Sequence, residues 1–321
     1  MITLSKIAKL ANVSVSTASK AFSGSTEVNE ETREMIFDIA KKNKCFKRFY
    51  NVKYPKLVIA IIAPEFASAY YNRYLSYIQN RLEKENCELC VSTTNFSSEN
   101  EKALMEYYYK HSDVDGIIVL DSQNNFTDHY EIPVVFINPK HEPMYAFSVI
   151  SNIKSSLLKS IDYLIDKNVD SIGFIGEKLT GGKQKLFELS LKEKGITPDK
   201  AYISISNRRF EEGGYDAMER MFSNNQLPRA IICAYDNMAI GAIRCIYDHG
   251  LSVPQDIAVL GMDDNSEASF LNPPLASISS QTEQLCRIAS EAVIDQIKGQ
   301  TVVLHHTVTS EFNLRKSFEI L

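Results

Sequence analysis

From residue 57 onward the chain alternates short apolar runs, rich in β-branched residues, with longer amphipathic stretches. Apolar runs that lack a polar residue at every second position are typical of parallel strands covered by helices on both faces. Eight such runs predict strands, at 57–63, 88–93, 116–120, 133–137, 171–175, 202–205, 230–234 and 257–261. The pattern therefore predicts an α/β fold with parallel sheets.

The alternation begins again near residue 151, in the stretch SNIKSSLLKSIDYLIDKNV. Eight strands with their helices exceed one ordinary doubly wound sheet, so we expect two lobes of similar architecture. The cleft between two such lobes would be lined by the carboxyl ends of their strands, which is where open α/β sheets bind ligands.

The first 46 residues have the periodicity of three short helices. Apolar residues between positions 4 and 11 recur on one helix face, and Asn12 suits the left-handed turn that follows. Ser14 is placed to cap a second helix that begins near Val15, and Asn29 is placed to cap a third. The pattern predicts a helix-turn-helix with a supporting third helix, in which short side chains at the start of the second helix can approach a DNA groove.

Charge is unevenly distributed between this head and the rest of the chain. Residues 1–56 carry eleven basic and five acidic residues, although the whole chain has a net charge of −5. From Lys41 to Lys56 there are seven bases and no acid, which suits a segment lying along phosphates. On charge alone, a solvated basic linker is equally compatible with this stretch.

The segments TLSKIAKLANVSVSTASKAFSG and VNEETREMIFDIAKK resemble the DNA-binding head of the lactose/galactose repressor (LacI/GalR) family. The resemblance implies base contacts by Val15, Ser16 and Lys20 in double-stranded operator DNA. It implies phosphate contacts by Ser14, Thr17 and Ser19. The remaining candidate DNA-binding residues are Thr3, Lys47 and Arg48.

The resemblance continues through SIGFIG, AYDNMAIGAIRCIYDHGLSVPQDIAVLGMDD and LNPPLASI, and so covers almost the whole chain. It implies a cytoplasmic repressor with the body fold of periplasmic sugar-binding proteins, a homodimer that binds a small effector, usually a sugar, in its cleft. We expect a helix-turn-helix domain at 1–46, a basic linker at 47–56 and an effector-binding and dimerisation domain at 57–321. The expected lobes are 57–151 with 282–308, and 152–281 with 309–321.

Candidate effector-binding residues lie after the predicted strands. Asp263 matches the family's effector-binding acid, and a carboxylate there can accept hydrogen bonds from two sugar hydroxyls. A helix cap is the alternative role, which we expect instead for Asp264 and Asp236. Three aromatic residues after the first strand could stack on a sugar ring or, with equal weight, pack in the core: Phe66, Tyr70 and Tyr71.

Several cleft positions depart from the family pattern. Phe187 aligns where the family usually has an effector-binding Arg, and Arg209 aligns where it usually has an aromatic residue. Beside Asn152 the family frequently has an Asp where this chain has Ser151. At Tyr235 the family has a small or amide residue. All except Ser151 are retained as effector-site candidates, and together these departures leave the effector undefined.

Two cations, Lys183 and Arg209, are candidates to face the cleft. A phosphorylated or acidic sugar is therefore an alternative to a neutral one, although exposed basic side chains are commoner than ligand-binding ones. An alternative function is a sugar-binding module without regulatory DNA binding, against which the basic head argues.

The linker FKRFYNVKYPK is shorter than the family's hinge and lacks its pattern of Pro, Asn, Ala, Arg and Leu. Insertion of a leucine into the minor groove is therefore not supported. Tyr50 or Tyr54 could contact DNA instead, with Lys47, Arg48 and Lys53 on phosphates. A plain tether is an equal alternative.

The remaining motifs exclude several function classes. No apolar run reaches the ~18 to 20 residues of a membrane helix, and the first residues lack a signal peptide's apolar region, so we expect no membrane partner. The stretch GEKLTGGKQ departs from a phosphate-binding loop at Gly182 and Gln184, and no other catalytic motif occurs. We expect neither catalytic residues nor a cofactor.

The six cysteines are scattered, and reduced core thiols are the simplest interpretation. Cys87 and Cys90 form a C-x-x-C, but no second Cys or His pair stands at finger-like spacing. The six histidines show no metal-binding spacing either, and His305 and His306 suit a solvated strand end. The sequence therefore predicts no metal site.

Overall fold

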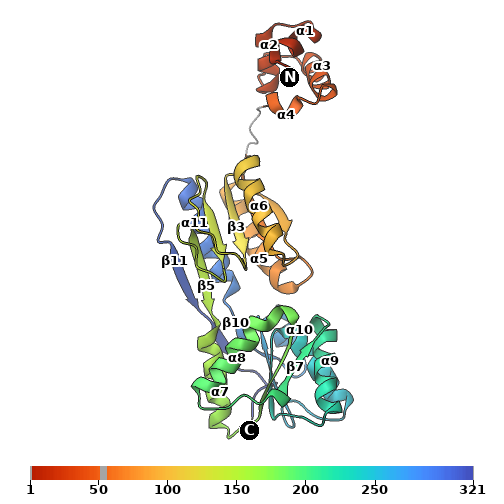
Figure 1. Cartoon of the computed structure of the whole chain (residues 1–321), viewed down its shortest axis with the longest axis vertical. Helices are drawn as coiled ribbons and strands as arrows, with labels where there is room; N and C mark the ends of the chain where they lie inside the picture. The colour runs from red at the N-terminus through yellow and green to blue at the C-terminus, as the bar shows by residue number, and fades with distance from the viewer. Residues whose placement is uncertain (1, 51–55, 321) are drawn as a thin grey trace. The chain divides into compact units, whose positions relative to one another are not determined.

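The computed structural model describes residues 2–50 and 56–320, with only the backbone described for residues 47 and 48. The chain forms two compact units, Met1–Leu57 and Val58–Leu321, which we call the head and the body. The α/β class with parallel sheets is confirmed (Figure 1). Among the described residues, no helix has both the length and the apolar character needed to cross a membrane.

Three helices form most of the head, namely α1 (Leu4–Leu10), α2 (Val15–Phe22) and α3 (Glu30–Lys42). Asn12 takes the left-handed conformation, with φ 53°, in the turn between the first two. The Ser14 hydroxyl caps α2 by accepting a hydrogen bond from the Thr17 amide at 2.9 Å. Asn29 caps α3 through the Thr32 amide at 2.8 Å.

The aromatic core of the head extends beyond α3. Phe22 stacks on Phe37 with ring centroids 5.5 Å apart, and Phe37 meets Phe46 edge-on at 5.0 Å. Phe46 begins the single-turn helix α4 (Phe46–Phe49) and stacks on Tyr50 at 4.9 Å. The beginning of the basic stretch thus packs on the head, because its aromatic rings bury area against Phe22 and Phe37. Lys53 and Tyr54 lie outside the described residues.

The first lobe of the body contains a six-stranded sheet in the order β11-β5-β4-β3-β1-β2. Its strands are β1 (Leu57–Ala63), β2 (Cys87–Thr93), β3 (Gly116–Leu120), β4 (Val134–Ile137), β5 (Phe147–Asn152) and β11 (His305–Thr309). The helices of this lobe are α5 (Ala69–Leu82), α6 (Ser98–His111) and α11 (Thr282–Ile297).

The second lobe contains a six-stranded sheet in the order β12-β10-β9-β8-β6-β7, in which only β12 pairs antiparallel, with β10. Its strands are β6 (Ile172–Glu177), β7 (Ile203–Ser206), β8 (Ala230–Cys233), β9 (Ala258–Met262), β10 (Ala276–Ser279) and β12 (Glu311–Asn313). Its helices are α7 (Ile153–Asp166), α8 (Gly181–Glu193), α9 (Phe210–Ser223) and α10 (Asp236–Asp248).

Four short 3₁₀ helices complete the body: η1 (Glu83–Glu85), η2 (Lys178–Thr180), η3 (Lys200–Tyr202) and η4 (Ser266–Phe270). All eight predicted strands are present. The sequence pattern did not predict β5, β10 and β12 as strands, because polar and small residues interrupt these short segments. His305 and His306 lie at a strand end, as expected, because β11 begins with these two residues.

The chain crosses between the lobes three times, from β5 to α7, from β10 to α11 and from β11 to β12 (Figure 1). The strands that lead into the crossings lie at one side of each sheet, so the crossings lie together, and we call them the hinge. Because the first crossing leaves the carboxyl end of β5, the carboxyl ends of the parallel strands in that lobe border the cleft.

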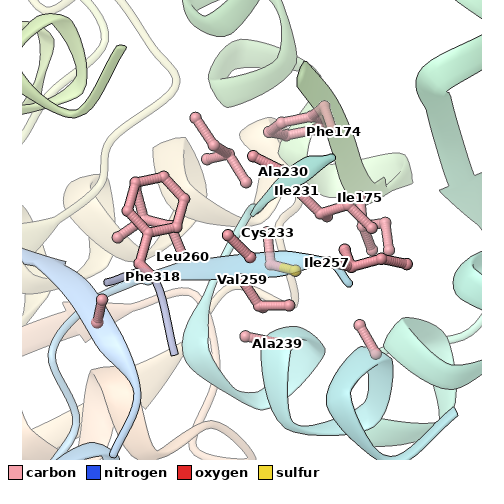
Figure 2. Packing of buried hydrophobic residues seen from close by; sticks show 14 of the residues in the cluster. Phe174, Ile175, Ala230, Ile231, Cys233, Ala239, Ile257, Val259, Leu260 and Phe318 are labelled. Carbon is pink, nitrogen blue, oxygen red and sulfur yellow. The ribbon is translucent and has the colours of Figure 1, made fainter. Parts of the chain in front are cut away.

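The second lobe has an extensive apolar core. Figure 2 shows residues of this core, among them Phe174 and Ile175 of β6, Ile231 of β8, Val259 of β9 and Phe318 near the end of the chain. All of these side chains are buried, as the uninterrupted apolar runs predict.

Helices α9 and α10 approach each other through glycine. A Cβ atom at Gly214 would lie 1.9 Å from the Met238 carbonyl oxygen, and one at Gly241 would lie 1.9 Å from the Glu211 carbonyl oxygen. Neither backbone can move away without separating the helices, so these two positions set the distance between them.

We expect Gly214→Ala to lower the free energy of unfolding by about 3 kcal/mol, because the added methyl group collides with backbone. Gly181→Ala is the matched control, since a Cβ at that helical glycine meets nothing within 4 Å. The control should change stability by less than about 0.5 kcal/mol. Equal denaturant midpoints for the two variants would contradict the close helix crossing.

Candidate effector cleft and DNA-binding surface

The start of α2 presents the candidate base-contacting residues. Val15 is 46% exposed although it is apolar, and Ser16 beside it is exposed. The first turn of α2 contains no acid, so nothing in that turn repels phosphate. Lys20 forms an exposed ion pair with Glu27, and such pairs are weak enough for the amine to exchange partners.

The hydroxyl candidates in the head also have local structural roles. Thr3 caps α1 by accepting a hydrogen bond from the Lys6 amide, and Ser14 caps α2. The Ser14 and Thr17 hydroxyl oxygens lie 2.8 Å apart, while Ser19 is exposed further along α2. The side chains of Lys47 and Arg48 lie outside the described residues.

A cavity of about 690 Å³ lies between the two lobes of the body. This volume is within the roughly 300–1,000 Å³ typical of small-molecule sites. Its lining comes from segments that follow strands, including Glu65 after β1, Asp121 after β3 and Asp263 after β9. The cavity therefore occupies the place that the strand pattern predicts for a ligand.

Six of the nine candidate effector residues line this cavity, namely Asp263, Tyr70, Tyr71, Lys183, Arg209 and Tyr235. The other three do not. Phe187 is fully buried and stacks on Phe174 with ring centroids 5.3 Å apart, because α8 turns it toward the core. Phe66 is 41% exposed. Asn152 caps α7, and its side chain accepts a hydrogen bond from the Ser155 amide.

Lys183 and Asp263 form an ion pair in the cavity wall. The Lys183 amine lies 3.2 Å from a carboxylate oxygen of Asp263 and also donates a 2.7 Å hydrogen bond to the Ala234 carbonyl. Burial raises the pKa of Asp263, and the nearby Lys183 amine opposes that shift. The pair places a donor and an acceptor side by side at the cavity surface.

The two neighbouring acids are not the helix caps that the sequence pattern predicts. The Asp236 carboxylate is buried, accepting hydrogen bonds from the Asn265 amide at 2.7 Å and the Ser277 hydroxyl at 2.6 Å. Burial raises the pKa of Asp236 to about 8. Asp264 instead pairs with Arg315 at 2.8 Å. Both acids connect strands and loops within the second lobe, which local sequence spacing does not reveal.

Arg209 connects the lobes across the cavity. Its guanidinium donates two parallel hydrogen bonds, at 2.6 and 2.7 Å, to the Glu65 carboxylate of the first lobe. The same group lies over two rings, 5.3 Å from the centre of Phe96 and 4.6 Å from that of Phe210. One of these rings belongs to each lobe, so Arg209 stands where the lobes meet.

A second arginine joins the lobes beside the first. Arg73 of α5 donates to the backbone oxygens of Asp263 at 2.9 Å and of Asp264 at 2.7 Å. The arrangement of the lobes therefore depends on charged side chains as well as on the hinge. Arg73 and Glu65 were not among the sequence candidates, and nothing in their local pattern identifies their partners, which lie far away in the sequence.

Several cavity residues adopt the left-handed backbone conformation, with φ of 60° at Phe96, 49° at Asp121, 50° at Asn138, 57° at Phe210 and 101° at Asp263. Bulky aromatic residues rarely adopt positive φ. Such backbone strain is concentrated at ligand-binding sites. It can be recognised only once the backbone is known.

Asp121 lies behind the tyrosines of the cavity. It accepts a 2.8 Å hydrogen bond from the Tyr71 hydroxyl, and burial raises the pKa of its carboxyl to about 6. Burial also raises the pKa of Tyr70 and Tyr71 well above the usual range. The tyrosines therefore present neutral hydroxyls beside their aromatic faces.

A two-lobed ligand-binding body with a three-helix DNA-binding head defines the class of ligand-controlled transcription regulators. The family model for bacterial regulatory proteins of the lacI family matches residues 3–44. A model for the periplasmic binding protein-like domain matches residues 161–318. The head is therefore a lacI-family DNA-binding domain, and the body contains a periplasmic binding protein-like domain.

Curated relatives match along nearly their whole length. The ribose operon repressor of Haemophilus influenzae is 27% identical, over 96% of this chain and 97% of that protein. A probable transcriptional repressor of Bacillus subtilis, ExuR, is 25% identical, over 99% of this chain and 98% of that protein. These relatives are repressors, and this chain is likewise a DNA-binding transcriptional regulator rather than an enzyme.

Solved structures show the same fold. The regulator CelR in complex with cellobiose has a TM-score of 0.67 and 22% identity, covering 99% of this chain and 100% of that chain. The lac repressor dimer bound to operator and the anti-inducer ONPF has a TM-score of 0.72 and 20% identity, covering 99% of both chains.

The free energy of unfolding should depend on pH because the Asp121 carboxyl is buried. Its pKa is raised in the folded state, to about 6, so ionisation destabilises the fold above that pH, and the penalty disappears as the pH falls toward the unfolded value of about 3.9. Asp121→Asn cannot ionise and should be more stable than the native chain by about 1–2 kcal/mol near pH 8, with little difference near pH 4.

The control for this comparison is Asp166→Asn, because that acid is exposed at the end of α7. Urea unfolding at both pH values provides the measurement. A stability difference that is the same at both values, or that grows on acidification, would contradict the raised pKa of Asp121.

Proposed function

We propose that this protein is a cytoplasmic homodimeric repressor of carbohydrate-utilisation genes, whose affinity for its operator is set by a neutral saccharide bound in the cleft. Residues 1–46 would read DNA, 47–56 would link, and 57–321 would bind effector and dimerise. The observation that carries this proposal is the cavity between the lobes, with its aromatic faces, paired charges and strained backbone.

Polar atoms that lack a hydrogen bond in the cavity wall support a polar ligand. Ser151 Oγ is buried and has no hydrogen-bond partner among the described residues. Arg209 Nε also makes no hydrogen bond there, although it lies 3.6 Å from a carboxylate oxygen of Glu177 in a longer ion pair. Buried polar groups are ordinarily hydrogen-bonded, so a ligand could supply the hydrogen bond that each atom lacks. Ligand hydroxyls could accept from Arg209 and either accept from or donate to Ser151.

The charges of the cavity favour a neutral ligand over a phosphorylated or acidic one. Its lining includes five acids, Glu65, Glu101, Asp121, Glu177 and Asp263, against three bases, Lys140, Lys183 and Arg209. Lys183 and Arg209 are already paired with Asp263 and Glu65. An anionic group would have to displace these carboxylates or lie near the others, whereas hydroxyls can hydrogen-bond to both partners of each pair.

Aromatic residues suit the apolar face of a sugar ring. Tyr70, Tyr71, Phe96, Phe210 and Tyr235 line the cavity. Among the relatives, one is named a ribose operon repressor, and one solved structure contains cellobiose. These names agree with a saccharide effector for this chain.

The inter-lobe arginines provide a route from effector to operator. A ligand changes an equilibrium only when it binds one arrangement of the lobes better than another. A saccharide between Arg209 and Asp263 would contact both lobes and so favour one arrangement. In a dimer, that arrangement would set the separation of two heads, which must match two half-sites of an operator.

The alternative function, a sugar-binding module without regulatory DNA binding, is disfavoured by the head. A sugar-binding module would not need the features of α2 that suit DNA binding. These are its N-terminal cap, its exposed Val15 and its first turn without an acid. Selection of operator sequences from random duplexes by the full chain tests this directly. Recovery of no common sequence would favour the sugar-binding module.

Lys20→Ala should test base recognition by α2. If Lys20 contacts a base edge, its removal lowers affinity for the selected operator by about 1–3 kcal/mol and relaxes preference at one base pair per half-site, with little change on random DNA. Lys9→Ala is the matched control, with the same loss of charge at an exposed position in α1. Fluorescence anisotropy measures both affinities. Equal losses on operator and random DNA for Lys20→Ala would contradict the assignment.

Asp263→Asn should test the effector contact. A thermal-shift screen of neutral monosaccharides and disaccharides, with sugar phosphates and uronic acids alongside, first identifies a ligand for calorimetry. Asp263→Asn should then lower ligand affinity by about 2–3 kcal/mol, because the carboxylate accepts hydroxyl hydrogen bonds. Ligand-free operator binding should change little.

Asparagine is chosen because it tolerates the positive φ of this position better than alanine. Asp166→Asn is again the control. Unchanged ligand affinity in Asp263→Asn would return this residue to a purely structural role. Tight binding of only the anionic sugars would overturn the neutral-ligand proposal.

A further inference from the structure

A second polar site lies on the surface formed by α9 and α10, apart from the effector cleft. It comprises Glu219 of α9, Cys245 of α10 and His249, the C-cap residue that follows α10. Each residue offers one possible ligand atom: a carboxylate oxygen of Glu219, the Cys245 Sγ and a ring nitrogen of His249. These three atoms all lie within 4.8 Å of one another. We propose that these three side chains bind a zinc ion.

Two of the three separations between ligand atoms at this site are close to those of a tetrahedral zinc centre, and the third is within 4.8 Å. His249 Nε2 and Cys245 Sγ each lie 3.5 Å from the same carboxylate oxygen of Glu219. Zinc bonds of about 2.0–2.2 Å to nitrogen and oxygen and about 2.3 Å to sulfur separate tetrahedral ligand atoms by about 3.4 Å for N and O and about 3.6 Å for S and O. Only a small adjustment of the three side chains would therefore be needed to admit the ion.

The imidazole of His249 is oriented for metal binding. Its Nδ1 lies 3.0 Å from the Cys245 carbonyl oxygen, which can only accept, so Nδ1 carries the proton and Nε2 has a free lone pair. The ring also stacks on Phe222, with centroids 3.9 Å apart and planes 7° apart. Hydrogen bonding of the second ring nitrogen to a carbonyl is the usual support of a metal-binding histidine.

The two helices that carry the ligands are held in fixed register. Gly214 and Gly241 bring α9 and α10 into backbone contact, as described above, and this packing does not depend on a metal. Cys245 lies in the last turn of α10 and His249 caps the end of the helix four residues later, so the two side chains lie on the same side of the helix end. The helix pair positions all three donors before any ion binds.

The donor set selects the kind of metal. Thiolate, imidazole and carboxylate together suit zinc, whereas calcium and magnesium require oxygen ligands. On binding, the Cys245 thiol releases its proton to solvent and becomes the thiolate ligand. Glu219 and His249 are partly exposed, so the fourth position is open to water. Bound zinc would stabilise the second lobe by joining α9 to α10.

The sequence pattern predicts no metal site, because the spacing of Cys and His along the chain shows only residues that are close in sequence. Cys87 and Cys90, the one close pair, do not form such a site. They lie three residues apart on β2, where side chains alternate between faces, and one is buried while the other is exposed. The third ligand of the α9–α10 site lies on another helix, so the spacing along α10 alone does not define it.

The test uses the full chain without an affinity tag, stripped of metal and kept reduced with a phosphine. One equivalent of Co²⁺ should produce a thiolate-to-cobalt charge-transfer band in the near ultraviolet, which Zn²⁺ abolishes by displacement. Competition with a chromogenic chelator then measures zinc affinity. Zinc should also raise the Tm of the native chain.

Three variants decide the assignment. Cys245→Ala should lose the charge-transfer band, and Glu219→Gln should weaken zinc binding by more than the roughly 10–100-fold typical of an outer-shell change. Cys90→Ala, which removes an exposed thiol elsewhere, should behave as the native chain.

Glu219→Gln keeps the proposal falsifiable if Cys245→Ala fails to fold, because Glu219 is partly exposed and similar in shape to Gln. The absence of a charge-transfer band in the native chain would overturn the proposal. So would zinc affinity that is unchanged in Glu219→Gln.

Discussion

Two parallel sheets joined by three neighbouring chain crossings are the constraint on which the rest of the body depends. Parallel strands present all their carboxyl ends at one edge of a sheet, and the crossings bring two such edges to a common cleft. Glu65, Asp121, Glu177 and Asp263 reach the cavity because each ends or follows a strand. The chemistry of the cleft therefore follows from the topology of the sheets before any individual contact is considered.

Charged contacts within that cleft couple the lobes. The Arg209–Glu65 pair and the hydrogen bonds from Arg73 join residues that belong to different lobes. Arg209 and Glu65 line the cavity, so they take part in holding the lobes and are available to a ligand at the same time. A ligand that exchanges hydrogen bonds with them changes the free energy of lobe closure, which is the physical requirement for control by an effector.

The distribution of charge separates the two binding functions along the chain. The head and its linker are basic, and the second helix of the head begins without an acid. The cavity is lined by more acids than bases, most of them paired or hydrogen-bonded to neutral groups. A nucleic acid is thus attracted to one unit of the chain, while the charges of the other support the neutral, hydroxyl-rich ligand proposed above.

The sequence by itself determined the elements whose signals are local. The caps at Ser14 and Asn29, the eight apolar strands and the cleft position of Asp263 all follow from periodicity, from capping chemistry or from the family pattern. Only the tertiary structure decided which cleft candidates face the cavity. Phe187 is buried in the core, and Phe66 does not line the cavity. The direction in which a helix or loop points its side chains depends on how it packs, which its position in the sequence does not specify. The partners Glu65 and Arg209, and the grouping of Glu219 with Cys245 and His249, likewise required the fold, since their proximity arises from the hinge and from the crossing of two helices.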